Sequence, residues 1–327
     1  MDDFHGKLAV ITGGGSGMGR ALALELTSEG CHVALCDMSA ESMAETEELC
    51  AAAMPAGTRI SSHLCDVSDE DQVIAFRDAV MAEHDTDQIN LLFNNAGIGG
   101  GGSFLRDDRD EWERTFGVCW NGVYYCTRAF MPLLVASDDA HLINTSSING
   151  FWASIGPRTS HTAYSAAKFA VKGFSEALLT DLRLNAPHVK VSVVMPGHIG
   201  TWIERNTPLI QGHGDPLNIS TAEVAVARRR MGQHGLPVDD LSDDTIRAAI
   251  KQRATDFLEN APTTAAQAGT IILNGVRQER WRILVGDDAH AIDEAVREHP
   301  EDAYEEQFMD RIRAAGHLGV LDIRVKE

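Results

Sequence analysis

The strongest constraint on the fold is a repeated alternation between short apolar runs and longer segments of helical spacing. The runs are rich in Val, Ile and Leu and are apolar on both faces, as in strands of a buried parallel sheet. They occupy residues 8–12, 32–37, 60–66, 89–94, 141–146 and 189–195, and a seventh run comes late, at 281–285. Between the first six runs, helices are expected at 17–29, 40–53, 69–84, 110–136 and 162–185. This alternation predicts an α/β fold with a doubly wound parallel sheet of about seven strands.

The alternation stops between residues 202 and 261. This segment contains three prolines and several glycines, followed by a helical stretch at 243–259. Since connections in α/β folds usually run about 2–6 residues, we expect either a substrate lid or a disordered insertion. A helical stretch near 262–278 then precedes the seventh run, and residues 287–327 form a helical C-terminal extension. The whole chain, 1–327, is expected to be one domain that carries this lid and this extension.

The acidic composition excludes two classes of partner. The chain has 48 Asp+Glu against 28 Lys+Arg, a formal net charge of −20. Nucleic acids and anionic membranes are bound by basic surfaces, so neither is an expected partner. Residues 287–310 contain ten acidic residues and one base, Arg297, and we interpret them as solvated helix surface. We therefore expect a small-molecule substrate.

The cysteines and histidines do not have the spacing of a metal site. None of the six cysteines belongs to a C-x-x-C pair, and His161 and His198 lack companions at ligand spacing. We expect buried thiols in a reducing compartment and no bound metal. The N-terminus is acidic where a signal peptide is basic, and no apolar run reaches the roughly 18–20 residues of a membrane span. These features predict a cytoplasmic protein.

The turn after the first run is rich in glycine. It follows a predicted strand and precedes a predicted helix, where glycines let the backbone approach a pyrophosphate and the helix N-terminus supplies amide donors. An ordinary tight turn would also explain the glycines alone. However, the second run ends in Asp37, whose carboxylate can accept hydrogen bonds from an adenosine ribose and repels a 2′-phosphate. Because Ser16 and Met38 offer no positive charge, the pattern favours NAD over NADP.

The glycine spacing is T-G-x-x-x-G-x-G, and with the motifs that follow in order it resembles the short-chain dehydrogenase/reductase family, which has a Rossmann-type fold. The resemblance covers about residues 5–201 and 262–286. Asp66-Val67 resembles the adenine contact, 94–97 matches the NNAG motif, and 196–201 matches the PG-x-x-x-T turn that packs on nicotinamide. The resemblance implies that the cofactor is bound by Thr12, Gly13, Ser16, Gly17, Met18, Gly19, Asp37, Met38, Asp66, Val67, Asn94, Asn95, Ala96, Gly97, Tyr164, Lys168, Pro196, Gly197, Ile199 and Thr201.

Four residues match the catalytic set of that family: Asn121, Ser147, Tyr164 and Lys168. Tyr164 and Lys168 are four residues apart and share a helix face, so the ammonium is expected to lower the pKa of the phenol from about 10 towards neutrality. The resemblance implies that Tyr164 exchanges a proton with the substrate, that Ser147 donates to its oxygen and that Asn121 anchors a water. Ser146 is adjacent to Ser147, and the family pattern places the active serine second.

The substrate site is less well defined. Seventeen positions separate Ser147 from Tyr164, several more than is usual in the family, so the pocket is expected to have its own shape. Ile98, Phe151, Trp152 and Trp202 are candidates for an apolar wall that suits a hydrophobic secondary alcohol or ketone, although they could equally pack the lid onto the body.

Two other functions stay open at this stage. One is reduction of a carbonyl on a sugar or carrier-bound substrate, and the other is dinucleotide sensing without turnover. A sensor would have little reason to keep all four residues of the catalytic set. The resemblance also implies a homodimer or homotetramer that pairs the helices carrying Asn121 and Tyr164.

Overall fold

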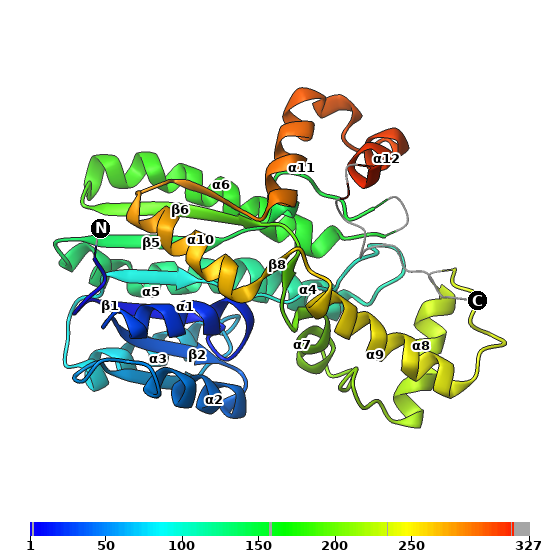
Figure 1. The fold of residues 1–327 in the computed structure, drawn as a ribbon, viewed down its shortest axis with the longest axis horizontal. Coiled ribbons are helices and arrows are strands. Elements are labelled where there is room, and N and C mark those ends of the chain that lie inside the picture. The colour runs from blue at the N-terminus through cyan, green and yellow to red at the C-terminus, as the bar shows by residue number, and fades with distance from the viewer. Residues whose placement is uncertain (2, 157–158, 234, 315, 317–327) are drawn as a thin grey trace.

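The computed structural model describes residues 1, 3–156, 159–233, 235–314 and 316. Seven parallel strands form one sheet in the order β3-β2-β1-β4-β5-β6-β9, with helices on both faces (Figure 1). The predicted doubly wound fold is therefore confirmed. The strands are β1 (Leu8–Thr12), β2 (His32–Asp37), β3 (Ile60–Leu64), β4 (Leu91–Asn94), β5 (Ala140–Thr145), β6 (Val189–Pro196) and β9 (Arg282–Val285).

Two apolar cores hold the helices against the sheet. On one face, α1 (Gly17–Ser28), α2 (Ala40–Ala51) and α10 (Ala265–Arg277) share a buried cluster with β1 and β2. On the other, α3 (Glu70–His84), α5 (Gly122–Ala136) and α6 (Thr162–Asn185) share a second cluster. Because both faces are covered, every residue of the central strands β1, β4 and β5 is buried, which explains their largely apolar runs in the sequence, whereas the edge strand β3 is partly exposed.

The site is positioned by the order of the strands. β1 pairs with β2 on one side and with β4 on the other, so the winding direction reverses between β1 and β4. In doubly wound sheets, ligands bind in the crevice at the carboxyl ends of the strands at this switch point. The glycine-rich turn after β1 and the segment after β4 both lie there.

Local boundaries differ from the predicted ones in several places, and β4 begins at Leu91, two residues later than expected. β3 ends at Leu64, two residues early, and the single helix predicted at 110–136 is divided. Its parts are α4 (Arg109–Phe116), the π-helical turn η1 (Gly117–Asn121) and α5. A small parallel sheet that the sequence did not predict joins β7 (Ile199–Gly200) to β8 (Thr263–Thr264) and brings together the two ends of the 202–261 segment.

The 202–261 segment is helical. It forms α7 (Ile203–Ile210), α8 (Thr221–Gln233) and α9 (Asp243–Glu259), and the Ser242 side chain caps α9 by accepting from Thr245 N. The alternative of a disordered insertion is therefore wrong for the described part of this segment. The helices gather at the end of the sheet where the glycine-rich turn lies (Figure 1).

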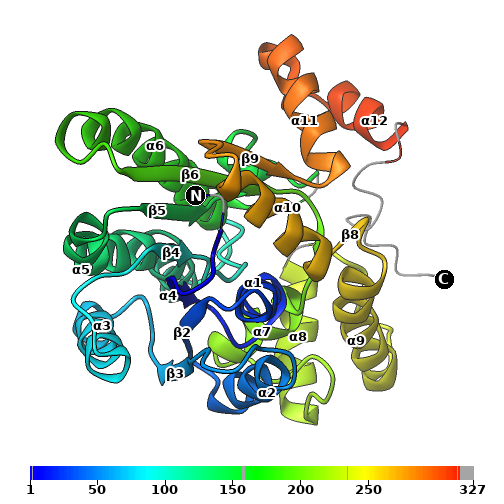
Figure 2. The ribbon, with the colours of Figure 1, turned by 60° about the vertical axis from the view of Figure 1, so that its left-hand side comes forward.

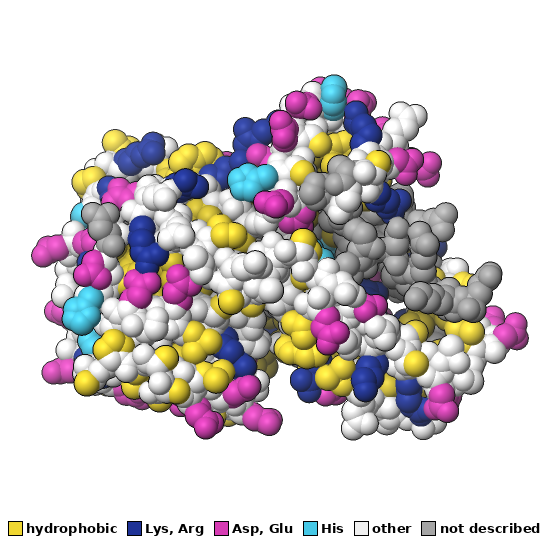
Figure 3. Space-filling model, in the orientation of Figure 1, with side chains coloured by type: hydrophobic (Ala, Val, Ile, Leu, Met, Phe, Trp, Pro, Cys, Tyr) yellow, Lys and Arg dark blue, Asp and Glu magenta, His cyan; other side chains and the backbone are white. Residues whose placement is uncertain are grey.

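The C-terminal extension is also ordered through residue 314. It forms α11 (Asp287–Glu298), the 3-10 turn η3 (Pro300–Asp302) and α12 (Glu306–Ala314). It lies at the same end of the molecule as the lid helices but on the other side of that end (Figures 1 and 2). The interpretation of 287–310 as solvated surface is wrong in part, because Asp288 and Asp293 are buried. On the face shown in Figure 3, acidic and basic side chains are interspersed.

Candidate active site

The glycine-rich turn brings backbone close to the segment after β4. Gly13 and Gly17 have φ of +67° and +53°, a region that glycine adopts at little cost. A Cβ on Gly13 would lie 2.9 Å from Ala96 Cα, and one on Gly19 would lie 2.0 Å from the Gly13 carbonyl oxygen. The turn therefore requires glycine, and α1 begins from it at Gly17 with its first amides free to bind an anion. This cradle fits a dinucleotide pyrophosphate.

Two predicted cofactor residues support this cradle and do not line it. Thr12 Oγ1 accepts from the backbone N of Asn95 and of Ala96, both at 3.0 Å, and so joins the ends of β1 and β4. Asn94 Nδ2 donates to Thr127 Oγ1 at 2.9 Å and to Asn144 Oδ1 at 2.8 Å. Thr12 and Asn94 are buried. With Gly19, they lie behind the cavity wall and hold the loops that form it.

Asp37 ends β2 at the edge of the cavity. Its Oδ2 accepts from Gly15 N at 3.0 Å and its Oδ1 from Ser39 N at 3.1 Å, which fixes the carboxylate. A Cβ on Gly15 would lie 2.9 Å from Asp37 Oδ2, so this turn leaves no room for a side chain. The negative charge is thus held beside the glycine turn, where the ribose of a dinucleotide is expected.

Arg114 of α4 is a charged neighbour of this end of the cavity that the sequence analysis missed. Its Nη1 donates to Asp66 Oδ2 and to Ser68 Oγ, both at 2.6 Å, and its Nη2 lies 3.1 Å from Met38 Sδ. No motif marks Arg114, because it reaches Asp66 across the fold from another helix. Since Asp66 pairs with Arg114, the guanidinium does not leave an uncompensated positive charge beside Asp37.

Ser147, Tyr164 and Lys168 line one cavity with the glycine turn and Asp37. Tyr164 hydrogen-bonds to Ser147. Lys168 Nζ lies 5.4 Å from the centre of the Tyr164 ring and donates to the Thr145 carbonyl at 2.9 Å. Three side chains, one from the loop after β5 and two from α6, therefore converge at one wall.

The pKa of Tyr164 moves opposite to the predicted direction. Burial raises the pKa of the Tyr164 phenol above its ordinary value, and the hydrogen bond from Ser147 only partly offsets this. Burial also lowers the pKa of Lys168. Desolvation outweighs the attraction expected from Lys168, whose ammonium is directed to a carbonyl oxygen. Tyr164 therefore holds its proton at neutral pH in this structure.

The adjacent residues Ser146 and Ser147 have different hydrogen-bond partners. Ser146 Oγ donates to the Lys168 carbonyl at 2.7 Å, and it fastens the loop after β5 to α6. A Cβ on Gly150 would lie 2.1 Å from that same Oγ, so the packing here is tight. Ser147 Oγ instead accepts from Asn149 N at 3.1 Å and meets Tyr164. Ser147 is thus the serine whose hydroxyl is placed for chemistry.

Asn121 is not among the residues that line the cavity. It is the last residue of the π-helical turn η1, which packs against α6. Such π turns are frequent at functional sites because they interrupt the regular hydrogen bonding of a helix. Cys119, a buried residue of the same turn, donates from Sγ to the Ile98 carbonyl at 3.2 Å. The role of Asn121 as a water anchor stays a prediction.

The 202–261 segment borders the same cavity. Asn206 Nδ2 donates to Ser16 Oγ at 3.2 Å, and Thr207 Oγ1 accepts from Gly99 N at 2.8 Å. The predicted residues of the turn after β6 also line the cavity: Pro196, Gly197, Ile199 and Thr201. Ile203, a further apolar residue expected near the pocket, lines it as well, and the lining residues that were not predicted are Cys65, Val118, Thr145, Asn206, Ile210 and Phe257. The helical spacing of 203, 206 and 210 was the available signal.

Two of the four candidates for the substrate wall lie elsewhere. Ile98 and Trp202 line the cavity, but Phe151 and Trp152 do not. Trp152 is fully buried against the C-terminal extension, where its Nε1 donates to the Ala303 carbonyl at 2.7 Å. Phe151 is half-buried beneath the guanidinium of Arg282, 5.6 Å from its ring centre. Placing Phe151 and Trp152 in the substrate wall was wrong, because the extension folds back over them.

The two histidines near the site are used in packing. The His161 ring lies 4.7 Å from the Tyr164 ring, and burial lowers the pKa of His161 to about 4. His198 Nε2 donates to the Phe257 carbonyl at 2.8 Å. Among the described residues, no group of three or more His, Cys, Asp or Glu side chains is placed to hold a metal ion. Within the same part of the chain, no helix is long and apolar enough to cross a membrane.

The sequence of this chain is similar to those of known oxidoreductases. The family described as short chain dehydrogenase matches residues 7–209. A Mycobacterium tuberculosis protein that carries the name oxidoreductase SadH is 35% identical over 293 residues, which is 90% of this chain and 91% of that one.

Two solved structures are similar in fold and differ in the dinucleotide they contain. A short chain dehydrogenase/reductase from Burkholderia phymatum, in complex with NAD, is 30% identical with a TM-score of 0.72, over 92% of this chain and 95% of that one. A metagenomic short-chain oxidoreductase in complex with NADP is 34% identical with a TM-score of 0.52, over 59% of this chain and 83% of that one. Proteins similar to this chain are thus found in complex with either dinucleotide.

Proposed function

We infer a specific activity from the fact that this chain belongs to the short chain dehydrogenase family and is an oxidoreductase with a nicotinamide dinucleotide site. We propose that it is an NAD-dependent dehydrogenase of hydrophobic secondary alcohols, or a reductase of the matching ketones. The observation that carries the proposal is the convergence of Ser147, Tyr164 and Lys168 on a groove that also contains Asp37. No role in sensing alone explains why a phenol, a hydroxyl and an ammonium meet there.

The chain's own residues move and hold the proton. Ser147 Oγ donates to the substrate oxygen, where negative charge develops during reduction. Tyr164 Oη gives its proton to that oxygen in reduction and takes it back in oxidation. Lys168, buried behind the phenol, stabilises the negative charge that Tyr164 acquires. When bound, the nicotinamide supplies or accepts the hydride.

The preference for NAD rests on the charge beside the ribose. Asp37 is fixed by two backbone amides, and Met38 next to it is exposed and uncharged. A 2′-phosphate would face the Asp37 carboxylate, while Arg114 is paired with Asp66. The NAD complex of the Burkholderia phymatum protein is consistent with this preference. Calorimetric titration with each dinucleotide tests it, and we expect NAD to bind at least about tenfold more tightly.

The substrate class rests on the lid side of the cavity. Ile98, Trp202, Ile203, Ile210 and Phe257 supply apolar surface opposite the catalytic residues. Apolar walls favour hydrophobic substrates because their burial removes apolar area from water. A screen of NAD⁺ reduction across secondary alcohols, from small aliphatic to polycyclic, tests this proposal. Activity confined to small polar alcohols, to sugars or to carrier-bound substrates would overturn it.

We propose that a second copy of the chain packs on the face formed by η1, α5 and α6. Trp120, Tyr124 and Phe174 form a ring cluster there, with the rings of Trp120 and Phe174 5.5 Å apart. Phe169 of α6 is 41% exposed. Light scattering of the purified protein tests for a homodimer or homotetramer, and a monomer at all concentrations would contradict it.

Two broader proposals concern the chain as a whole. We propose that residues 1–327 act as a single domain with 202–261 as its lid, which predicts one cooperative unfolding transition. We also propose a cytoplasmic location, since all six cysteines are free and buried, as suits a reducing compartment. Cell fractionation tests the location.

A further inference from the structure

The C-terminal extension packs on the loop that carries Ser147. Beyond β9, the chain folds back and forms a separate apolar cluster with this loop, away from the two cores of the sheet. The cluster joins the extension to η2 (Ile148–Gly150) and Trp152, and its buried members are Ile148, Trp152, Ala289, Ile292, Ala303, Phe308, Met309 and Ile312. The Trp152 and Phe308 rings are 5.6 Å apart. The catalytic loop is therefore covered by residues about 150 positions later in the chain.

A chain of hydrogen bonds leads from the extension to Ser147. Trp152 Nε1 donates to the Ala303 carbonyl at 2.7 Å. The Trp152 carbonyl accepts from Asn149 Nδ2 at 3.0 Å, and Asn149 N donates to Ser147 Oγ at 3.1 Å. A second bond runs beside the first, since Ala153 N donates to Tyr304 Oη at 3.1 Å. The position of the Ser147 hydroxyl thus depends on contacts with residues 303 and 304.

The start of the extension holds the other side of the site. Asp288, 2% exposed at the first turn of α11, accepts from His198 N at 2.6 Å through Oδ2. A Cβ on Gly197 would lie 2.2 Å from Asp288 Oδ1, so this carboxylate packs directly on the turn that lines the cavity. His198 in turn donates to the carbonyl of the lid residue Phe257. The N-terminal end of α11 therefore contacts the turn at Gly197 and His198, and His198 connects it to Phe257 in the 202–261 segment.

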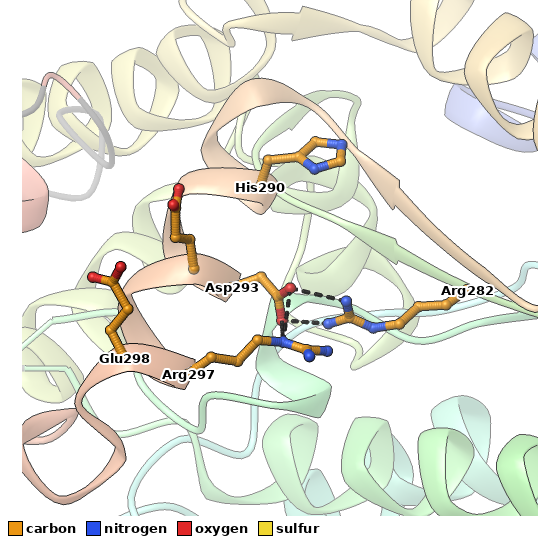
Figure 4. Close-up of a pocket in the computed structure, with 6 residues that line it drawn as sticks. Arg282, His290, Asp293, Arg297 and Glu298 are labelled. Atoms are coloured by element: carbon orange, nitrogen blue, oxygen red, sulfur yellow. Dashed lines mark hydrogen bonds and ion pairs between the residues drawn. The ribbon is translucent and has the colours of Figure 1, made fainter.

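The extension is fastened to the edge of the sheet by an ion network. Asp293 of α11 pairs with Arg282 of β9 and with Arg297, and Figure 4 shows its carboxylate between the two guanidinium groups. Arg282 also lies over the ring of Phe151. Three of the charged residues that line the pocket of Figure 4, Arg282, Asp293 and Arg297, thus hold α11 in place.

We propose that residues 287–314 are a clamp that positions Ser147 and the Gly197–His198 turn, with Trp152 and Asp288 as its positioning residues. The proposal rests on the proposed function of the same site. A donor to a developing oxyanion acts only when it is held in place beforehand, and displacements of about 1 Å cost activity. The clamp supplies this fixation from outside the doubly wound core.

The direct test is hydrogen–deuterium exchange, which needs no substrate. Trp152→Phe removes the Nε1 donor, and Asp288→Ala removes the acceptor of His198 N. We expect at least tenfold faster exchange in 147–153 for Trp152→Phe and in 197–199 for Asp288→Ala, with 13–19 unchanged in both. Trp281→Phe and Asp287→Ala are matched controls, because they make the same kind of substitution at exposed side chains, and Asp287 is next to Asp288 in α11. Unchanged exchange in both segments overturns the clamp.

A second, less disruptive variant tests the contact between the extension and the Ser147 loop if Trp152→Phe fails to fold. Tyr304 is 61% exposed, so Tyr304→Phe removes the acceptor of Ala153 N without opening a cavity. It should speed exchange at 152–154 with little loss of thermal stability. If exchange there is unchanged in a folded Tyr304→Phe protein, the proposed path from the extension to the loop is wrong.

Kinetics distinguish positioning from a purely structural role. Because the hydrogen bond from Ser147 lowers the pKa of Tyr164, a displaced Ser147 should move the pH profile of alcohol oxidation upward. We expect Trp152→Phe to lower kcat about tenfold, with the NAD⁺ dissociation constant unchanged. A lower melting temperature with an unmoved profile would show a structural role and overturn the proposal. A wild-type protein without turnover would instead overturn the proposed function, while the exchange experiment still decides the clamp.

Discussion

The ammonium nitrogen of Lys168 lies 5.4 Å from the centre of the Tyr164 ring and donates to the Thr145 carbonyl. This arrangement places the buried cation over the phenol ring and in a hydrogen bond with a backbone carbonyl. Tyr164 is therefore a protonated acid at rest, and Ser147 is the neighbour that its hydroxyl meets.

The pH dependence of reduction follows from the raised pKa of Tyr164. A phenol whose pKa lies above its ordinary value of about 10 keeps its proton throughout the neutral range. Ketone reduction should therefore stay constant through neutrality and decline only as the pH rises past this folded pKa. The pH profile of kcat for NADH-dependent reduction checks it. A decline centred near about pH 7 would show a lowered pKa and contradict this account.

Ser147→Ala and Ser146→Ala should have different effects. Removing the donor to the substrate oxygen is expected to lower kcat by about 10²–10³-fold, with stability little changed. Ser146→Ala removes a buried hydrogen bond to the Lys168 carbonyl and should cost about 1–3 kcal/mol of stability. Steady-state kinetics and chemical denaturation of both variants provide the comparison. Equal losses of kcat would mean that the two serines are not separated as described.

Asp37→Ser should weaken the discrimination against NADP. The substitution removes the charge that faces a 2′-phosphate and keeps a small polar group for the ribose. We expect the NADP dissociation constant to fall about tenfold relative to that of NAD. Glu41→Gln, which removes a charge from the following helix, is the matched control. An unchanged ratio in Asp37→Ser would show that Asp37 does not select the dinucleotide.

The fold and the cofactor end of the site could be predicted because their determinants are local in the sequence. Buried strands show as apolar runs, and the turn after β1 needs glycine at positions where a Cβ would clash. The Trp152 contact with Ala303 could not be predicted, since it joins residues 151 positions apart with no shared motif. Arg114 was missed for the same reason, and the pKa of Tyr164 was misjudged because burial is a property of the packed structure.

Stability should decrease in mild acid because of His141. This histidine is fully buried, and burial lowers its pKa to about 4. Ser192 Oγ donates to the Arg280 carbonyl, so His141 Nε2–H donates to Ser192, and among the described residues His141 Nδ1 has no hydrogen-bond partner. The unfolded chain binds the proton near pH 6.5 and the folded chain does not. This contribution to stability is therefore complete above about pH 6.5 and is lost as the pH falls towards about 4.

The expected loss is at most about 3 kcal/mol between those two pH values, from roughly 1.4 kcal/mol per pKa unit. His141→Gln keeps a donor towards Ser192 without a titrating ring, so its stability should depend less on pH. Urea denaturation of wild type and His141→Gln across this range measures the difference. Parallel pH dependences would contradict the assignment to His141.

The most direct test of the proposed function is NAD⁺ reduction by wild type and Tyr164→Phe with a hydrophobic secondary alcohol, followed by absorbance. Dinucleotide binding is measured on the same samples. The account predicts that wild type turns over and that Tyr164→Phe loses about 10²–10⁴-fold in kcat while it still binds NAD⁺. Equal turnover by the two proteins, or no binding of NAD⁺ by wild type, would contradict it.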